Sequence, residues 1–148
     1  GKQKNSSKSV NDKLSWLACN GENLPFNDNK FDIVSISFGL RNITNKSIAL
    51  NEIYRVLKPG GRFMCLEFSK VNVSVLNRFY QIWSSNVIPA LGAKISGQKE
   101  NYEYLIESIK RFPDQNELSS LISSSNFISV KHRNLSGGIA AIHSGWKI

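Results

Sequence analysis

Hydrophobic and polar positions change their period several times along the chain. Residues 1–13 are polar and rich in Lys, Asn and Ser, which predicts a disordered leader or the remnant of a helix. A short apolar run at 14–19 predicts a strand, and a loop through Asn20-Gly21-Glu22 follows it. The compact β-branched run Phe31–Ser37 predicts a second strand.

A helix is predicted after this strand, because apolar residues recur there at helical spacing. Thr44 or Asn45 can cap its start, and Pro59-Gly60-Gly61 is expected to stop it. Its apolar face comprises Leu50, Ile53, Tyr54 and Leu57. Residues 62–68 form a nearly continuous apolar run, typical of a strand buried on both faces. Residues 31–68 therefore predict a β-α-β unit.

The rest of the chain predicts three helices and a hairpin. Helical spacing occurs from Val75 to Trp83 and again from Tyr102 to Ile109, and Asp114 with Glu117 resembles a capping box that opens a third helix. The runs 128–135 and 139–143, joined through Ser136-Gly137-Gly138, predict a terminal antiparallel hairpin. The fold class is therefore α/β, with a mainly parallel sheet and this hairpin at its end.

Composition limits the function classes. With 148 residues, of which 41% are hydrophobic, the chain suits one globular domain, and it contains no run of about 18 apolar residues that could span a bilayer. No secretory signal is visible, so we expect a cytoplasmic protein with at most peripheral contact at the inner face of a membrane. We expect Cys19 and Cys65 to be reduced core residues and expect no metal site.

The net charge of +8 leaves two kinds of anionic partner to consider. The 19 Lys and Arg residues are spread along the chain without a cluster of four, which is typical of a basic solvated surface. A loose affinity for acidic lipid headgroups remains open. The net charge is the only feature that favours a nucleic-acid-binding domain, so we expect no nucleic-acid partner.

Five short motifs follow one another at close spacing. They are Asn20-Gly21-Glu22-Asn23-Leu24-Pro25-Phe26, Phe31-Asp32, Ser37-Phe38-Gly39-Leu40-Arg41-Asn42, Arg55-Val56-Leu57-Lys58-Pro59-Gly60-Gly61-Arg62 and Leu66-Glu67-Phe68-Ser69. Together with Phe112-Pro113-Asp114-Gln115 and the closing His143-Ser144-Gly145-Trp146-Lys147, they resemble the ubiquinone/menaquinone biosynthesis C-methyltransferases. These belong to the class I S-adenosylmethionine-dependent methyltransferases.

The resemblance implies transfer of a methyl group from S-adenosylmethionine to a ring carbon of a polyprenylated benzoquinol or naphthoquinol. It implies a partial Rossmann-like sheet in which residues 14–148 are the C-terminal two-thirds of the methyltransferase domain, without the first two strands and the glycine-rich loop. Activity of this chain alone is then in doubt. The alternative is a non-catalytic fragment or accessory subunit that needs a separate N-terminal piece. A homodimer and other enzymes of quinone synthesis are further candidate partners.

The resemblance also implies roles for residues near the strand ends. Asn20 and Gly21 would contact the adenine, although a plain turn also favours Asn-Gly, and Ser37 would contact the cofactor at the end of its strand. Arg41 and Asn42 would form the catalytic pair, with the Arg41 cation stabilising a phenolate and Asn42 holding the ring oxygen.

Glu67 would complete the catalytic group. It could accept the phenol proton through water, or instead form a structural ion pair with Arg41 or Lys70. Phe38 and the segment that includes Tyr102 and Tyr104 would bind the substrate, with an apolar slot for the prenyl tail.

Overall fold

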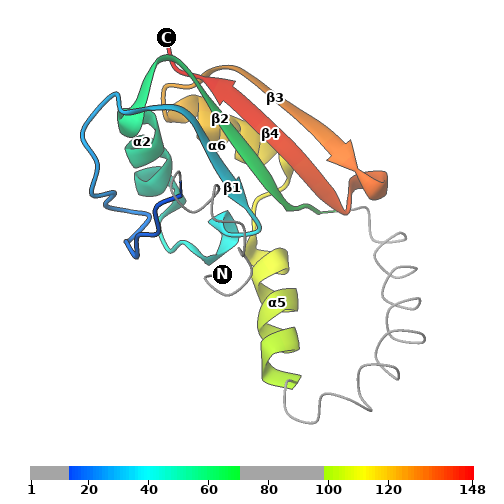
Figure 1. Ribbon diagram of the computed structural model, residues 1–148. Helices are drawn as coiled ribbons and strands as arrows, with labels where there is room; N and C mark the ends of the chain where they lie inside the picture. The colour runs from blue at the N-terminus through cyan, green and yellow to red at the C-terminus, as the bar shows by residue number, and fades with distance from the viewer. Residues whose placement is uncertain (1–13, 71–98) are drawn as a thin grey trace.

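The computed structural model describes residues 14–70 and 99–148, with the side chains of 99–103 and 106 excepted (Figure 1). The expected polar leader at 1–13, the predicted helix from Val75 to Trp83 and the Tyr102 side chain lie outside the described residues.

Four strands form one mixed sheet. They are β1 (Phe31–Ser37), β2 (Leu57–Phe68), β3 (Ile128–Leu135) and β4 (Ala140–Trp146), and their order across the sheet is β1-β2-β4-β3. β1 and β2 are parallel, whereas β4 is antiparallel to both of its neighbours. The prediction of an α/β fold with a β-α-β unit and a terminal antiparallel hairpin is confirmed. Between its two strands the hairpin contains the short turn η3 (Ser136–Gly138).

Two helices cover one face of this sheet. Figure 1 shows α2 (Lys46–Val56) and α6 (Gln115–Ser124) behind the strands, while α5 (Lys99–Arg111) extends away from the end of the sheet. The core lies between the sheet and the first two helices, and its buried members include Leu50, Phe63 and Ile122. Figure 1 shows no described helix over the opposite face.

The capping residues of both covering helices agree with the sequence. Asn45 caps α2, and its Oδ1 accepts a hydrogen bond from the backbone N–H of Ile48 at 3.1 Å. Asp114 caps α6, where its Oδ1 accepts from the N–H of Glu117 at 2.9 Å while the Glu117 carboxylate accepts from the Asp114 N–H at 2.8 Å. The predicted capping box is confirmed.

The role predicted for Pro59-Gly60-Gly61 is wrong. The helix α2 ends at Val56, and all three residues lie within β2. Gly60 has a φ of 78°, which lets the backbone turn, and its N–H donates to the Lys147 carbonyl at 2.8 Å. Gly61 has no room for a side chain, because an added Cβ would lie 2.7 Å from the Lys58 carbonyl oxygen.

β2 is also not buried on both faces. Phe63, Cys65 and Glu67 are buried beneath the helices, whereas Met64 and Leu66 on the other face are partly exposed. The alternation arises because the described helices pack against one face only.

The strand predicted at 14–19 is wrong as well. These residues adopt no regular structure, and Leu17 is 60% exposed. A strand is stable only when a neighbour satisfies its backbone groups, and no described strand lies beside this run. Cys19 is consequently exposed, contrary to expectation, while Cys65 is buried as predicted.

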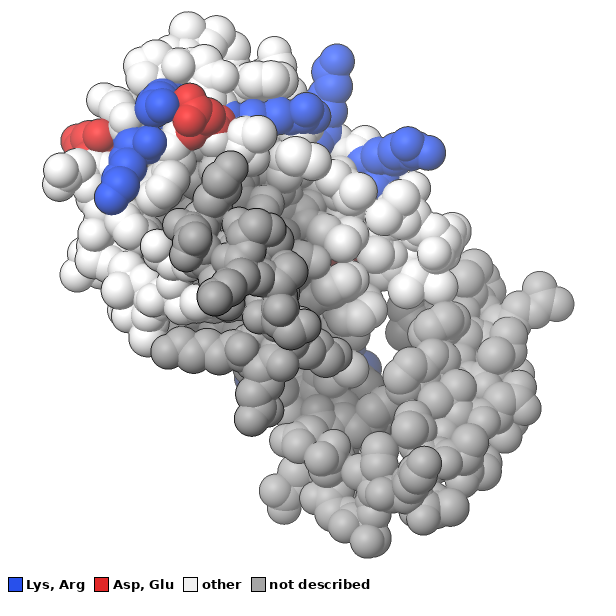
Figure 2. All heavy atoms as spheres, viewed as in Figure 1, with Lys and Arg blue, Asp and Glu red and all other residues white. Residues whose placement is uncertain are grey.

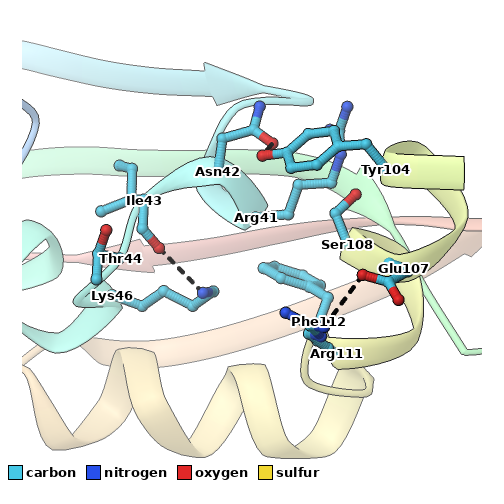
Figure 3. A pocket seen from close by; sticks show the side chains of 10 residues that line it. All are labelled: Arg41, Asn42, Ile43, Thr44, Lys46, Tyr104, Glu107, Ser108, Arg111 and Phe112. Atoms are coloured by element: carbon cyan, nitrogen blue, oxygen red, sulfur yellow. Dashed lines mark hydrogen bonds and ion pairs between the residues drawn. The ribbon is translucent and has the colours of Figure 1, made fainter. Parts of the chain in front are cut away.

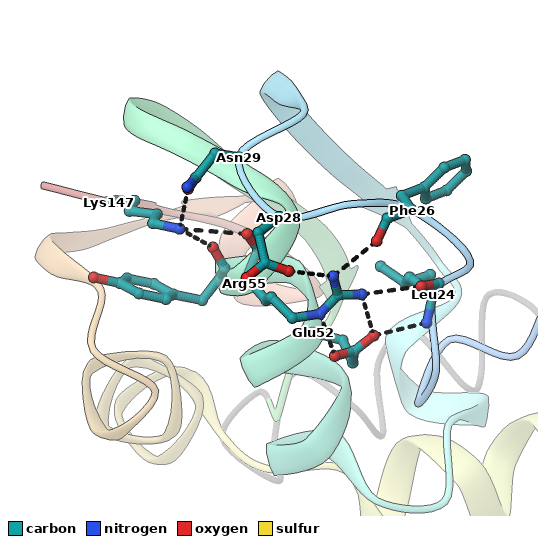
Figure 4. A network of polar contacts seen from close by, with 8 residues as sticks. Leu24, Phe26, Asp28, Asn29, Glu52, Arg55 and Lys147 are labelled. Carbon is teal, nitrogen blue, oxygen red and sulfur yellow. Dashed lines mark hydrogen bonds and ion pairs between the residues drawn. The ribbon is translucent and has the colours of Figure 1, made fainter.

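A polar network fixes the loop before β1 against α2 (Figure 4). Arg55 donates from Nε and Nη2 to the Glu52 carboxylate at 2.7 and 2.8 Å, and from Nη2 to the Leu24 carbonyl at 3.0 Å. Its Nη1 donates to the Phe26 carbonyl and to Asp28, both at 2.7 Å. One guanidinium therefore holds the loop that leads from the Asn20 turn into β1.

Candidate active site

The site begins where β1 ends. Phe38 has a φ of 53°, in the left-handed region, so the chain turns sharply out of the strand. The short 3-10 helix η1 (Leu40–Asn42) follows, and the fully buried Leu40 anchors it in the core. This turn places Arg41 and Asn42 at the carboxyl end of the parallel pair β1 and β2, where open α/β sheets bind ligands.

Arg41 forms an ion pair with Glu67 near the end of β2. The Arg41 Nη1 lies 3.2 and 3.1 Å from the two Glu67 carboxylate oxygens, and the Arg41 backbone N–H donates to the same carboxylate at 3.4 Å. The Glu67 side chain is 1% exposed and that of Arg41 is 12% exposed. The structure thus shows Glu67 in an ion pair with Arg41. Lys70, the other predicted partner, pairs with Glu117 instead, with its Nζ 3.8 Å from Glu117 Oε2.

Other contacts fix the orientation of the Arg41 guanidinium. Its Nη1 also donates to the Phe38 carbonyl, which the left-handed turn directs toward it. Its plane lies over the Phe68 ring at 5.4 Å, and the Phe38 and Phe68 rings are 4.8 Å apart. The buried Nε has no hydrogen-bond partner among the described residues. The guanidinium is therefore held in place by Glu67, the Phe38 carbonyl and the Phe68 ring.

A cavity of about 250 Å³ opens beside this pair, between η1 and α5 (Figure 3). The Tyr104 hydroxyl donates to Asn42 Oδ1 at 3.2 Å, which joins the two walls of the cavity. Its lining residues come from the η1–α2 connection and from α5 with the residue after it: Arg41, Asn42, Ile43, Thr44, Lys46, Tyr104, Glu107, Ser108, Arg111 and Phe112.

The charges of the cavity favour an anion. Two cations are matched by carboxylates, since Arg41 pairs with Glu67 and Arg111 Nη2 lies 3.1 Å from Glu107. Lys46 has no carboxylate partner among the described residues; its Nζ donates to the Ile43 carbonyl at 3.1 Å and lies 5.8 Å from the Phe112 ring centre. Lys46 therefore gives the cavity one positive charge in excess, next to the Phe112 ring, which we call the aromatic floor.

The residues predicted to bind the cofactor lie outside this cavity. Gly21 packs against Ile43, one of the lining residues, because an added Cβ would lie 3.0 Å from Ile43 Cδ1. Asn20 Oδ1 accepts from the Glu22 N–H at 3.0 Å, as the simple-turn interpretation expects, which leaves its NH₂ group as the free end. Ser37 is exposed at the end of β1, and no side-chain hydrogen bond joins it to the other described residues.

The structure therefore brings together most of the predicted catalytic and substrate-binding residues. Arg41, Glu67 and Phe38 are in direct contact, as are Asn42 and Tyr104. Sequence reasoning missed several lining residues, among them Lys46, Ser108 and Phe112. A signal was present for the last two, because they follow Tyr104 at intervals of four residues, the spacing of one helix face, although Phe112 is the residue after α5.

Comparison with known proteins decides the family. A model of the ubiE/COQ5 methyltransferase family matches residues 1–147. The chain belongs to the ubiE/COQ5 methyltransferase family. It is 51% identical over 148 residues to the mitochondrial 2-methoxy-6-polyprenyl-1,4-benzoquinol methylase of Gallus gallus, and 48% identical to the ubiquinone/menaquinone biosynthesis C-methyltransferase UbiE of Brucella canis. The matches cover all of the chain but 48% and 55% of these relatives, so it spans about half their length.

Solved structures confirm the fold of this ubiE/COQ5 family member. A SAM-dependent methyltransferase from Thermotoga maritima matches with a TM-score of 0.60 at 23% identity, covering 86% of the chain and 61% of that structure. The [4+2]-cyclase SpnF matches with a TM-score of 0.67 at 14% identity, covering 95% of the chain and 58% of that structure. The second protein is named as a cyclase, so the fold alone does not define the reaction.

Proposed function

We propose that the chain provides the quinol-methylating site of an S-adenosylmethionine-dependent C-methyltransferase of ubiquinone or menaquinone biosynthesis. The observation that carries the proposal is the cavity between η1 and α5, which joins Arg41 and Asn42 to an aromatic floor and one excess positive charge. A quinol ring that has lost a phenol proton is both aromatic and anionic, so it matches this cavity. The names of the relatives favour the same substrate class.

Arg41 and Asn42 act on the ring oxygen. The Arg41 cation and the Asn42 NH₂ group stabilise the phenolate, and this charge makes the neighbouring ring carbon nucleophilic. Glu67 holds the Arg41 guanidinium in place through its two carboxylate oxygens. The Tyr104 hydroxyl donates to Asn42 Oδ1, so the NH₂ group is the end of that amide that is left to bind a ring oxygen.

The cofactor would be held by the turn and strand end beside the cavity. S-adenosylmethionine supplies an electrophilic methyl group on sulfur, and a ring carbon held in line with it needs no covalent enzyme intermediate. The exposed Asn20 NH₂ group can donate to a ring nitrogen of adenine, Gly21 allows close approach of the backbone, and the exposed Ser37 hydroxyl is free for a polar contact. These three residues fit the adenosine part of such a ligand.

We place the protein at the inner face of a membrane, in peripheral contact. Of the helices in the described ranges, none combines the length and hydropathy of a bilayer-spanning segment. A polyprenyl tail partitions into lipid, so an enzyme that methylates its headgroup has to work at the surface of the bilayer.

Methyl transfer tests the proposal directly. The chain is joined to the remaining part of the Brucella canis relative, and this chimera is incubated with isotopically labelled S-adenosylmethionine and a demethylated quinol. We expect the label on a ring carbon of the product, located by NMR. Label on oxygen, or no transfer while the intact relative is active in the same assay, would refute it. The 148-residue chain is assayed in parallel, which tests the accessory-subunit alternative.

A further inference from the structure

The last strands of the chain carry only basic charges. No Asp or Glu occurs from residue 118 to the C-terminus, while Lys131, Arg133 and Lys147 do. Lys147 is used internally, since its Nζ donates to the Tyr54 carbonyl at 2.9 Å and to Asn29 at 2.8 Å. Lys131 and Arg133 are exposed and form no ion pair among the described residues.

These two side chains lie on the open face of the sheet, away from α6. In the strand register Lys131 is opposite Ser144 and Arg133 is opposite Ile142, and these β4 residues alternate with the buried His143. The strand β2, which pairs with the other edge of β4, adds Arg62 to the same face, where the Arg62 Nη2 donates to the Ser144 hydroxyl at 3.4 Å. Three cations from β2 and β3 therefore flank β4.

Apolar side chains border these cations. Trp146 is 39% exposed and lies under the Arg62 guanidinium, 5.0 Å from it, and Ile128 is opposite Trp146 in the register and 40% exposed. We call these five residues the basic face: Arg62, Ile128, Lys131, Arg133 and Trp146. Figure 2 shows the Lys and Arg side chains over β3 and β4 with no acidic side chain among them, whereas acidic groups lie toward the β1 side.

We propose that the basic face docks on an anionic lipid surface. A sheet face with cations around an aromatic and an aliphatic side chain offers Coulomb attraction to lipid phosphates and shallow apolar contacts to the headgroup region. Arg133 is the member of this face nearest the candidate site, because it is opposite Ile142, and Ile142 pairs with Leu66, the residue before Glu67. Docking would thus hold the cavity close to the bilayer surface. The choice of lipid over nucleic acid rests on the proposed function, because a polyprenylated substrate resides in lipid.

Vesicle binding tests the proposal. The chain is sedimented with vesicles of phosphatidylcholine mixed with phosphatidylglycerol, and with vesicles of phosphatidylcholine alone. We expect binding to the anionic vesicles only, weakening as salt is raised. The double variant Lys131→Gln/Arg133→Gln is expected to bind roughly 30-fold more weakly, since each of the two cations near such a surface contributes about 1 kcal/mol. The matched control Lys58→Gln/Lys110→Gln removes the same charge elsewhere and should bind as the parent does.

Three results would overturn the proposal. They are no binding to anionic vesicles, equal weakening by both double variants, and tighter binding of a single-stranded RNA than of the vesicles by fluorescence anisotropy. An assay of methyl transfer by the chimera to a quinol with a short, water-soluble tail separates lipid docking from the proposed methylation, because this substrate needs no membrane. The Lys131→Gln/Arg133→Gln variant should keep that activity, so loss of vesicle binding with normal transfer identifies the surface and leaves the reaction unaffected.

Discussion

Replacing Glu67 by Gln should destabilise the fold far more than the size of the change suggests. Glu67 is 1% exposed and accepts hydrogen bonds from Arg41 Nη1, the Arg41 N–H and the Phe68 N–H. Removing one partner of a buried ion pair costs roughly 3–5 kcal/mol, because the other charge is left uncompensated. Gln can still accept hydrogen bonds and Arg41 keeps its contact with the Phe38 carbonyl, so we expect about 2–3 kcal/mol.

Urea denaturation followed by circular dichroism measures this loss. With a urea dependence of about 2 kcal/mol per molar for a small domain, the unfolding midpoint should fall by roughly 1 M. Glu107→Gln is the matched control, since its partner Arg111 is 80% exposed and such surface pairs contribute less than about 1 kcal/mol. The double variant Arg41→Met/Glu67→Gln should recover part of the loss.

Equal midpoints for Glu67→Gln and Glu107→Gln would refute this reasoning. They would mean that the Arg41–Glu67 pair is not shielded from water as the structure shows. The guanidinium would then lack the fixed orientation on which the proposed role of Arg41 depends.

Three further predictions concern titration, capping and thiol reactivity. Burial, and to a smaller extent the nearby His132, lowers the pKa of His143. The unfolded chain therefore binds the proton more readily than the folded chain, and the free energy of unfolding should fall as the pH drops below about 6.5. Urea midpoints measured at successive pH values should show this fall in the parent and lose it in His143→Gln. Asp114→Ala removes the hydrogen bonds that its carboxylate accepts from the Asn116 and Glu117 N–H groups, while the bond from the residue 114 N–H to Glu117 remains, and it should cost about 1 kcal/mol by the same assay; an unchanged midpoint would contradict the cap. Burial, and to a smaller extent the Glu67 charge, raises the pKa of the Cys65 thiol to about 12. A thiol reagent should therefore modify only Cys19 in the folded chain and both cysteines in denaturant. Fast reaction of both cysteines without denaturant would contradict the burial of Cys65.

Local features of the fold could be predicted from the sequence. β1 has the bounds of its β-branched run, and α6 starts at the capping box, because both signals lie within a few neighbouring residues. The run at 14–19 shows the limit of this approach, since its residue types suit a strand but pairing depends on a neighbour that its own composition cannot reveal. The prediction that Pro59-Gly60-Gly61 stops the helix was wrong for a similar reason, because Gly60 pairs with Lys147, a residue far along the chain.

The site could be predicted only in part. The contact between Arg41 and Glu67 was one of several alternatives for this carboxylate, and the structure shows both of its oxygens close to Arg41 Nη1. The sequence alone does not reveal the left-handed turn at Phe38 that brings Arg41 back to the end of β2. The cavity depends on where α5 lies relative to η1, which the periodicity of neither segment specifies. Its residue Ser108 was therefore overlooked, although Tyr104 on the same side of the helix was named.

The central claim is that the ring oxygen of a quinol meets Arg41 in the cavity beside η1. The most direct test compares turnover with cofactor affinity in the chimera carrying Arg41→Ala. Turnover should fall roughly 100-fold or more, while calorimetric titration with S-adenosylhomocysteine gives an affinity close to that of the parent. An equal loss of turnover and of S-adenosylhomocysteine affinity would contradict the account and make Arg41 a structural residue.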